Sequence, residues 1–334
     1  MSNKIIVVDS GRQFVKALSG GKRKLFQSVV AMAPERFNLE IKDKPEDLFI
    51  NHQGEGWLIG GLAFRQSTSG TQERSSDKAN QQNLLLVLTA CSLFAEPGEK
   101  VTLLTNCPAR DWGTQRDRLK EVFKGYHRVE HKAGERKGRV IDFTITETFV
   151  FPEGEMAFFG YVYDQFLNVR FPDLLSSNVL ILDVGDQTCN YISMNPGGEP
   201  FDSLSGSLDL GMFRAYAGLQ AKLEERGLEI TQGELADALI NRKTIYRGKH
   251  PVYVGTEVQW HYNQLASDIY DRLNSRLRFN RYQYIIMTGG GGYPLHRYFK
   301  ERLGGQCEVH SAPESGQWLN AMGAEVIYKL SRRG

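Results

Sequence analysis

The sequence contains few cysteines, and none of them form a metal-binding or disulfide pattern. The four cysteines are scattered along 334 residues without a Cys-x-x-Cys pair; they are Cys91, Cys107, Cys189 and Cys307. This spacing argues against a zinc site and against a disulfide framework. It suits a reducing compartment, so we expect a cytoplasmic protein.

Long apolar runs are also missing. Nowhere do about 18 apolar residues follow one another, which is the length that a membrane-spanning helix needs. The chain enters a strand-like segment at once, without the basic start and apolar stretch of a secretion signal. We therefore expect neither secretion nor a membrane span.

An excess of one charge is missing as well. Lys and Arg number 41 against 39 Asp and Glu, which leaves a net charge of +2. So small a charge supplies no broad field for gripping DNA, and we expect no direct sequence-specific nucleic-acid binding. The hydrophobic share of 41% is ordinary for a globular protein, and the length of 334 residues favours two domains.

The most informative segment that is present covers residues 179–188. Its apolar residues end in Asp183-x-Gly185-x-x-Thr188, which predicts a buried strand followed by a tight hairpin. A glycine turn lets backbone N–H groups and the Thr188 hydroxyl approach phosphate oxygens. A carboxylate beside phosphate requires a divalent cation between them. The segment thus predicts a metal-bound nucleotide.

A single motif of this kind has an ordinary alternative, because an Asp at a strand end often bonds only to its own turn. A second copy changes this interpretation. Residues 4–16 repeat the apolar strand and the Asp-x-Gly turn, with Asp9 and Gly11 in the places of Asp183 and Gly185. Two such hairpins facing each other across a cleft could hold one polyphosphate from both sides.

A third segment agrees with the two hairpins. Residues 284–288 form an apolar strand that is followed by Gly289, Gly290, Gly291 and Gly292. Pro294 stands at a plausible first helical position, and an amphipathic helix follows. A glycine run at a helix start accepts an anion or a flat ring close to its backbone.

Two Asp-x-Gly hairpins followed by a late strand with a glycine-rich turn resemble the actin-like ATPase superfamily. The likeness is to the ParM-type bacterial actins that segregate plasmids. It is supported by Lys16 five residues after Gly11, by Pro152-Glu153 before Gly160, and by the glycines after Thr288. The resemblance implies an α/β, actin-like (duplicated RNase H-like) fold of two lobes with a nucleotide cleft between them.

The same resemblance implies a domain plan. The first lobe would cover residues 1–170 with a small inserted subdomain at about residues 28–72. The second would cover residues 171–334 with an inserted subdomain at about residues 220–254.

The resemblance also implies the ligands and the residues that bind them. We expect ATP or GTP with Mg²⁺, the metal being held by Asp9 and Asp183 through water. The expected nucleotide-binding residues are Asp9, Ser10, Gly11, Arg12, Gln13, Lys16, Asp183, Gly185, Asp186, Gln187, Thr188, Gly289, Gly290, Gly291 and Gly292.

Glu153 follows Pro152 at an expected helix start, and it has two interpretations. An acid at this position is stabilised by the positive N-terminal end of the helix dipole, whatever its function. It can also orient or deprotonate a water that attacks a phosphate. ParM-like proteins carry a hydrolytic glutamate after a proline in this linking segment, so the resemblance favours Glu153, with Glu155 as the substitute. Asp183 is the other expected catalytic residue.

Three residues depart from the pattern of the superfamily. Asp186 and Gln187 stand where relatives carry glycine or a small residue with threonine, and an extra acid beside phosphates is repulsive unless it faces a metal or turns outward. Arg12 is larger than the usual residue of the first loop. We hypothesise that Arg12 offsets Asp186 by binding phosphate.

The resulting expectation is a filament that assembles with Mg-ATP and disassembles after hydrolysis. By resemblance it segregates plasmid DNA through an adaptor protein bound to that DNA. Three rivals remain. They are a small-molecule kinase of the same fold, a chaperone ATPase, which would need a peptide-binding domain after residue 334, and a cytoskeletal scaffold at a membrane, which would show a terminal amphipathic helix.

Periodicity and turn residues predict the remaining elements. A hairpin is expected between residues 128–131 and 140–149, a solvated turn at residues 20–24 and an exposed loop at residues 67–80. Helices are expected at residues 80–94, 114–123, 154–168, 212–226, 234–243 and 257–279.

Overall fold

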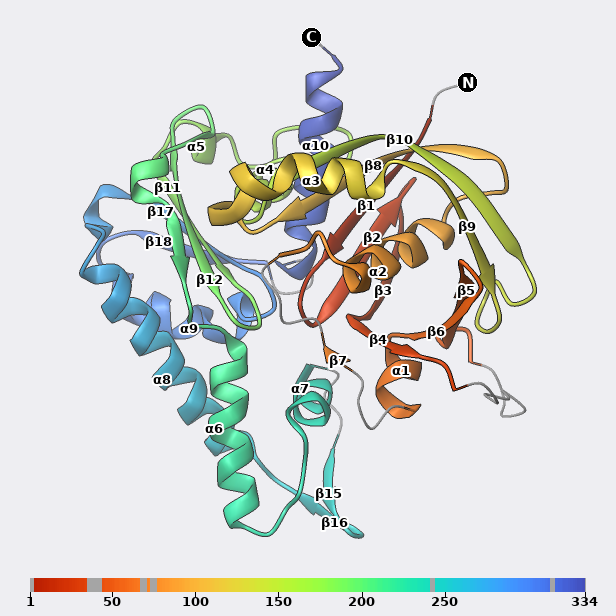
Figure 1. Ribbon diagram of the computed structural model, residues 1–334. Coiled ribbons are helices and arrows are strands. Elements are labelled where there is room, and N and C mark those ends of the chain that lie inside the picture. Colours follow the sequence, from red (N-terminus) through yellow and green to blue (C-terminus); the bar gives the residue numbers. More distant parts are fainter. Residues whose placement is uncertain are drawn as a thin grey trace. The chain divides into compact units, whose positions relative to one another are not determined.

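The computed structural model describes residues 3–34, 44–66, 71–72, 77–240, 244–312 and 316–333. Most of the expected loop at residues 67–80 and part of the expected subdomain at residues 28–72 lie outside these ranges. The chain divides into two compact units (Figure 1). The first contains Met1–Asn168 with Asn320–Gly334, and the second contains Val169–Leu319.

The first unit is built on a ten-stranded sheet with the order β3-β2-β1-β8-β10-β9-β5-β6-β4-β7. Its strands are β1 (Lys4–Ser10), β2 (Phe14–Ser19), β3 (Lys22–Gln27), β4 (Val29–Met32), β5 (Leu48–His52), β6 (Glu55–Ile59), β7 (Thr71–Gln72), β8 (Glu99–Cys107), β9 (Gly125–His131) and β10 (Val140–Pro152). The central strand β1 pairs antiparallel with β2 and parallel with β8, which is parallel to β10. The predicted hairpin of β9 and β10 is confirmed, with Val140 opposite Glu130.

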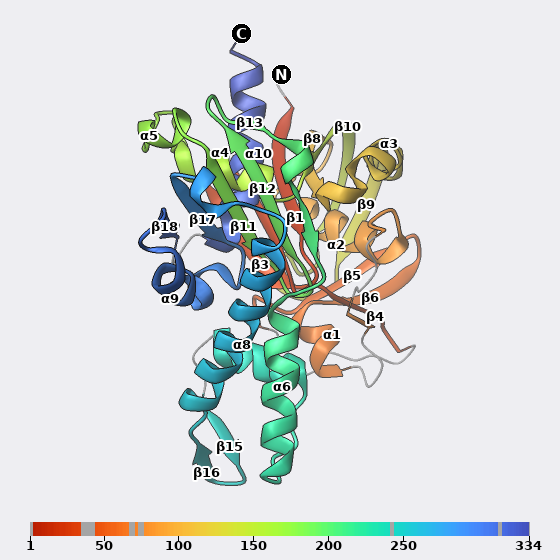
Figure 2. The same ribbon diagram turned by 90° about the vertical axis from the view of Figure 1, so that its left-hand side faces the viewer.

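Helices cover both faces of this sheet. They are α1 (Gly61–Gln66), α2 (Gln81–Ser92), α3 (Trp112–Phe123), α4 (Glu155–Val162) and α10 (Leu319–Ser331). Figures 1 and 2 show α2 and α3 on one face and α10 on the other. The apolar character of α2 almost throughout predicts burial on more than one side, and most of its residues are buried.

The helix predicted at residues 154–168 is shorter than expected. It ends at Val162, and the following residues turn around Asp164 instead. The Asp164 carboxylate accepts hydrogen bonds from the backbone N–H groups of Phe166 and Asn168. An aspartate that binds its neighbours' backbone in this way competes with the helix, so the prediction was wrong for this segment.

The second unit repeats the central pattern of the first. Its main sheet has the order β13-β12-β11-β17-β18, and β14 also pairs with β12. The strand β11 pairs antiparallel with β12 and parallel with β17, which is parallel to β18. The strands of the main sheet are β11 (Val179–Val184), β12 (Cys189–Asn195), β13 (Glu199–Pro200), β14 (Gly206–Leu208), β17 (Tyr284–Thr288) and β18 (Glu308–Ser311). The strands β15 (Ile245–Arg247) and β16 (His250–Val252) pair with each other in a separate sheet.

The predicted helices of the second unit are present with shifted ends. They are α6 (Met212–Glu225), α7 (Gln232–Ile240), α8 (Gly255–Asn274) and α9 (Gly292–Leu303), with the short α5 (Pro172–Leu175) before β11. The helix α7 starts before the predicted Glu234, because Thr231 and Glu234 form a reciprocal capping box. Residues 241–243 lie outside the described part. The helix α8 stops at Asn274, well before Phe279, where a short 3-10 turn lies.

The last helix, α10, packs within the first unit. The ring of Tyr328 meets Phe149 of β10 edge to face, with centroids 5.1 Å apart. Its Asn320 side chain accepts a hydrogen bond of 2.9 Å from the Gly154 N–H. The contacts therefore group Asn320–Gly334 with the first unit, whereas the sequence expectation placed residues 171–334 together.

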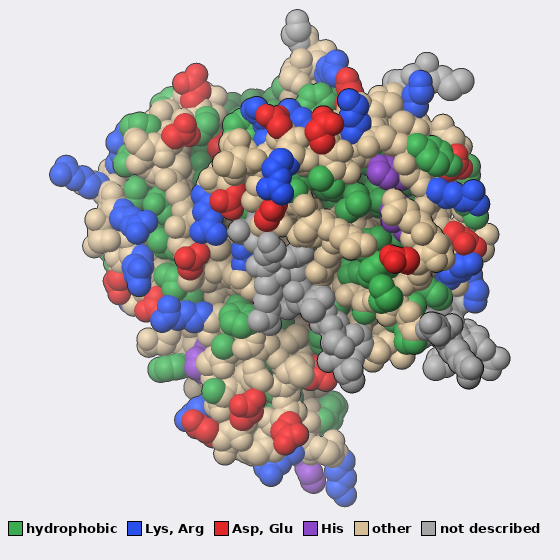
Figure 3. All heavy atoms as spheres, viewed as in Figure 1, with side chains coloured by type: hydrophobic (Ala, Val, Ile, Leu, Met, Phe, Trp, Pro, Cys, Tyr) green, Lys and Arg blue, Asp and Glu red, His purple; other side chains and the backbone are tan. Residues whose placement is uncertain are grey.

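In the described ranges, no helix has both the length and the apolar character to cross a bilayer. Figure 3 shows basic and acidic side chains interspersed over the visible face, in keeping with the near balance of charge in the sequence.

Gly323 allows the close approach between α10 and α4. A Cβ added at Gly323 would lie 1.7 Å from the carbonyl oxygen of Met156. We expect Gly323→Ala to lower the free energy of unfolding by about 1–3 kcal/mol, the usual cost of overpacking, as measured by urea denaturation.

Gly113→Ala is the matched control, since Gly113 lies in helix α3 of the same unit with no heavy atom within 4 Å of an added Cβ. This change should leave stability unchanged or raise it by up to about 1 kcal/mol. Equal effects of the two substitutions would contradict the packing of α10.

Candidate functional site

The first hairpin forms where β1 and β2 meet, as predicted. Asp9 lies opposite Lys16, and Ser10 lies opposite Val15. The N–H of Gly11 donates to the carbonyl of Phe14 at 3.1 Å and closes a loop that contains Arg12 and Gln13. The buried hydroxyl of Ser10, at the end of β1, has no hydrogen-bond partner within the described part of the chain. The first unit therefore presents a polar loop with a glycine at its start.

Asp9 is the charged centre of this hairpin. It is only 4% exposed, and its two carboxylate oxygens are held by Lys16 Nζ at 3.0 Å and Asn106 Nδ2 at 2.9 Å. Burial alone would raise the pKa of Asp9, but the ammonium groups of Lys16 and Lys78, together with the Asn106 hydrogen bond, lower it below its usual value. Asp9 thus stays ionised at neutral pH.

Glu153 reaches the same neighbourhood from the end of β10. Its N–H donates to Cys107 O at 2.9 Å, which continues the pairing of β10 with β8. The helix α4 begins only at Glu155, after Gly154, so Glu153 precedes the helix that it was expected to start. Its carboxylate accepts a hydrogen bond of 2.6 Å from Lys78 Nζ. Glu155 lies in the first turn of α4.

Lys78 and Asn106 belong to this network, and the sequence reasoning missed both. Lys78 Nζ donates to Asn106 Oδ1 at 3.1 Å, and Asn106 in turn donates to Asp9. Asn106 lies at the carboxyl end of β8, beside the carboxyl end of the parallel strand β1. Its position near Asp9 could therefore have been predicted from the rule that polar site residues gather at the carboxyl ends of parallel strands. Lys78 stands in a polar segment, where no pattern distinguishes it from a solvated lysine.

The second hairpin has the same construction, as predicted. Val184 lies opposite Cys189, and the Gly185 N–H donates to Thr188 O at 2.8 Å. The acid at the strand end, Asp183, is 7% exposed. The loop continues through Asp186 and Gln187 and is tied to the start of α6, because Phe213 N–H donates to Asp186 O at 2.7 Å.

The glycine run lies directly beside Asp183. In the pairing of β11 with β17, Asp183 is opposite Thr288, the residue before Gly289. Gly289 has a φ of +77°, and an added Cβ would lie 2.5 Å from Asp183 Oδ1. Gly291 donates to Val184 O at 2.9 Å, and Gly292 is the first residue of α9. Pro294 is thus the third helical residue, where an N–H is still dispensable, not the first as predicted.

The predicted metal ligands fit a hard cation only in part. Carboxylates such as Asp9 and Asp183 supply the oxygen donors that Mg²⁺ takes. Within the described ranges no group of three or more His, Cys, Asp or Glu side chains could hold a metal. Each unit offers one buried carboxylate, which suits Mg²⁺ that is held through a single carboxylate and completed by substrate phosphates and water.

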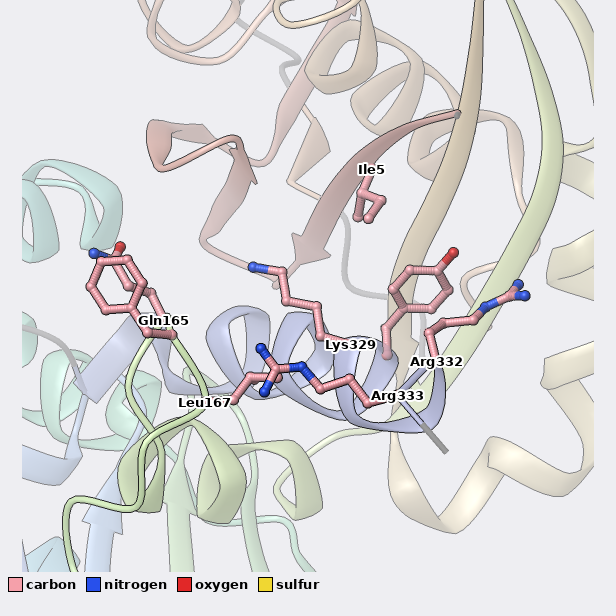
Figure 4. A pocket seen from close by; sticks show the side chains of 8 residues that line it. Ile5, Gln165, Leu167, Lys329, Arg332 and Arg333 are labelled. Carbon is pink, nitrogen blue, oxygen red and sulfur yellow. The ribbon is translucent and has the colours of Figure 1, made fainter. Parts of the chain in front are cut away.

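A cavity of about 500 Å³ lies elsewhere in the first unit. Figure 4 shows it between Ile5 near the start of β1, Gln165 after α4, Lys329 of α10 and Arg332 just after that helix. Asp9 is near the other end of β1, so this cavity is separate from the hairpin network.

Two family models match this sequence. Residues 8–155 match the N-terminal domain of actin-like proteins, and residues 181–301 match the C-terminal part of the MreB-like archaeal actin homologue. The first range contains Asp9, Lys78 and Glu153. The second contains Asp183 and the glycine run.

Individual proteins agree with these matches. An archaeal actin homolog of Thermoplasma acidophilum is 28% identical over 191 residues, which are 56% of this chain and 56% of that protein. The match thus spans little more than half of the curated relative.

Two solved structures share the fold along nearly the whole chain. A 15-stranded ParM filament from Clostridium botulinum gives a TM-score of 0.79 at 21% identity, covering 99% of this chain and 100% of that one. The ParM of Bacillus thuringiensis with ATP gives 0.76 at 18% identity, covering 100% of each chain.

The glycine run supplies a test of the second hairpin. We expect Gly289→Ala to lower the free energy of unfolding by about 1–3 kcal/mol, because alanine is strained at a positive φ and its Cβ would displace the Asp183 carboxylate. Thermal or urea unfolding measures the loss.

The neighbouring Gly290 gives the control, since an added Cβ there meets nothing within 4 Å. Gly290→Ala should change stability by no more than about 0.5 kcal/mol. A Gly289→Ala chain as stable as the control would show that the turn does not hold Asp183 as described.

Proposed function

Because this chain belongs to the actin-like superfamily, we propose that it is a nucleotide-dependent, filament-forming ATPase. The observation that carries the proposal is the repeated acid-tipped hairpin. Each unit ends a central strand in Asp-x-Gly, with Asp9 in the first and Asp183 in the second, and each acid is nearly buried. A buried carboxylate suits a cation, and the N–H groups of the glycine turn beside it suit phosphate oxygens.

The predicted site residues divide into roles by their chemistry. Lys16, beside Asp9, carries a positive charge that phosphates would attract. The loop of Gly11, Arg12 and Gln13 offers backbone and side-chain hydrogen-bond donors. Gly185 and Thr188 do the same in the second unit. Gly289, Gly290, Gly291 and Gly292 leave backbone open to a nucleotide. Mg²⁺, when bound, would neutralise charge on the phosphate oxygens.

Hydrolysis is assigned to Glu153. Its carboxylate orients a water whose oxygen forms a bond to the terminal phosphorus, while the bond from that phosphorus to the bridging oxygen breaks. The proton of the water passes to Glu153 and then to solvent. The products are the nucleoside diphosphate and inorganic phosphate.

Assembly and cargo are proposed from the similar proteins. One of the similar solved structures is a ParM filament, and another is ParM with ATP. We propose that this chain likewise assembles with Mg-ATP or Mg-GTP in the cytoplasm and disassembles after hydrolysis. From the similarity to ParM, we propose that the filament segregates plasmid DNA through a DNA-bound adaptor. The net charge of +2 is consistent with an indirect link to DNA.

Sedimentation and light scattering with ATP, with ADP and without nucleotide test the proposal. We expect a pelletable polymer with Mg-ATP and little or none with ADP. Transfer of phosphate to sugars without any polymer would favour a small-molecule kinase. Polymer that ignores the nucleotide would favour a passive scaffold.

Glu153→Ala separates assembly from turnover. Removing a group that orients water should slow phosphate release about 100-fold while polymer still forms with ATP. The control is Glu99→Ala, which removes a half-exposed glutamate from an ion pair with Lys4 at 3.1 Å. Phosphate release should stay near normal in this control, and normal release by Glu153→Ala would remove Glu153 from its role.

A further inference from the structure

Lys78 is a buried lysine for which the proposed function has no role so far. It is 6% exposed, and its ammonium contacts Glu153 Oε1 at 2.6 Å and Asn106 Oδ1 at 3.1 Å. Lysine is almost never this buried unless it is paired. Its partner is the residue to which hydrolysis is assigned, so the pair bears on the chemistry of the site.

The backbone of Lys78 is held firmly on both sides. Its N–H donates to Gln115 Oε1 at 2.9 Å, and its carbonyl accepts from Asn83 Nδ2 at 2.8 Å. Both of these side chains are buried. Movement of the ammonium group would therefore come from the flexible four-carbon stem, while the backbone stays in place.

The charges around Lys78 alternate along a chain of contacts. Glu153 meets Lys78, Lys78 meets Asn106, Asn106 meets Asp9, and Asp9 meets Lys16. Burial would lower the pKa of Lys78, but the carboxylates of Glu153 and then Asp9 outweigh it and raise that pKa. Lys78 is thus a permanent positive charge, and the two acids and two lysines balance.

A balanced, buried ion pair is a poor source of stability, because removing both charges from water costs about as much as their attraction returns. The pair also occupies one acceptor site on Oε1 of Glu153, and water cannot donate a hydrogen bond to that site while Lys78 holds it. A terminal phosphate offers an ammonium group more negative charge and three acceptor oxygens.

We propose that Lys78 is a positioning residue that senses the terminal phosphate. Its ammonium leaves Glu153 for an oxygen of that phosphate, and the freed Glu153 carboxylate can then accept from the attacking water. After the phosphate has gone, Lys78 returns to Glu153. The inference rests on the proposed function, since it requires a nucleoside triphosphate at this site.

The test compares two chains that both lack the Glu153 carboxylate and differ only in the ammonium. These are Glu153→Gln and the double variant Lys78→Met/Glu153→Gln. Their affinities for ADP and for a non-hydrolysable ATP analogue are measured by calorimetry, with melting curves to confirm folding. The double variant replaces an ion pair by two neutral side chains, so neither charge of the pair is left without its partner.

We expect Glu153→Gln to bind the ATP analogue about ten-fold more tightly than the unmodified chain, because its Lys78 is released. The double variant should bind the ATP analogue at least about ten-fold more weakly than Glu153→Gln does. Both variants should bind ADP as the unmodified chain does. Lys4→Met, which removes a half-exposed paired lysine at the start of β1, should change neither affinity.

Equal binding of the ATP analogue by the single and double variants would overturn the inference, and so would a gain shared equally by ADP. In either case the unmodified chain would still bind nucleotide, and the proposed function would stand. If the unmodified chain bound neither nucleotide, the proposed function would fail and the role of Lys78 would fall with it.

Discussion

The parallel pairing of central strands fixes where the polar side chains of each unit gather. In the first unit β1, β8 and β10 are parallel, so Asp9, Asn106 and Glu153 all follow or end strands at the same edge of the sheet. In the second unit the parallel pair β11 and β17 puts Asp183 beside Thr288 and the glycines after it. One topological pattern, used twice, thus places a buried acid at the end of a central strand in each unit.

Charge balance is the second constraint, and it gives the site its chemistry. Asp9 and Glu153 are compensated by Lys16 and Lys78 within hydrogen-bond distance. Buried charges are tolerated only when they are paired in this manner. A phosphate that attracts either lysine would therefore leave one carboxylate without its ion-pair partner. A cation can take the place of Lys16 beside Asp9, and a water can take the place of Lys78 beside Glu153.

The sequence allowed prediction of whatever depends on local pattern. Both hairpins, the glycine run and the apolar helix α2 follow from residues that are close together in the chain. Lys78 escaped prediction because its burial depends on strands that are distant in sequence. The extent of α4 was wrong because Asp164 turns the chain, which periodicity does not report. The place of α10 depends on a close backbone contact at Gly323.

The central claim is that the hairpins of Asp9 and Asp183 act on the same nucleotide. Calorimetric titration with Mg-ATP tests it most directly, by comparing the unmodified chain with Asp9→Asn and Asp183→Asn. The account predicts one nucleotide per chain and a loss of affinity of about ten-fold or more in each variant. Two nucleotides per chain, or unchanged binding in either variant, would contradict it.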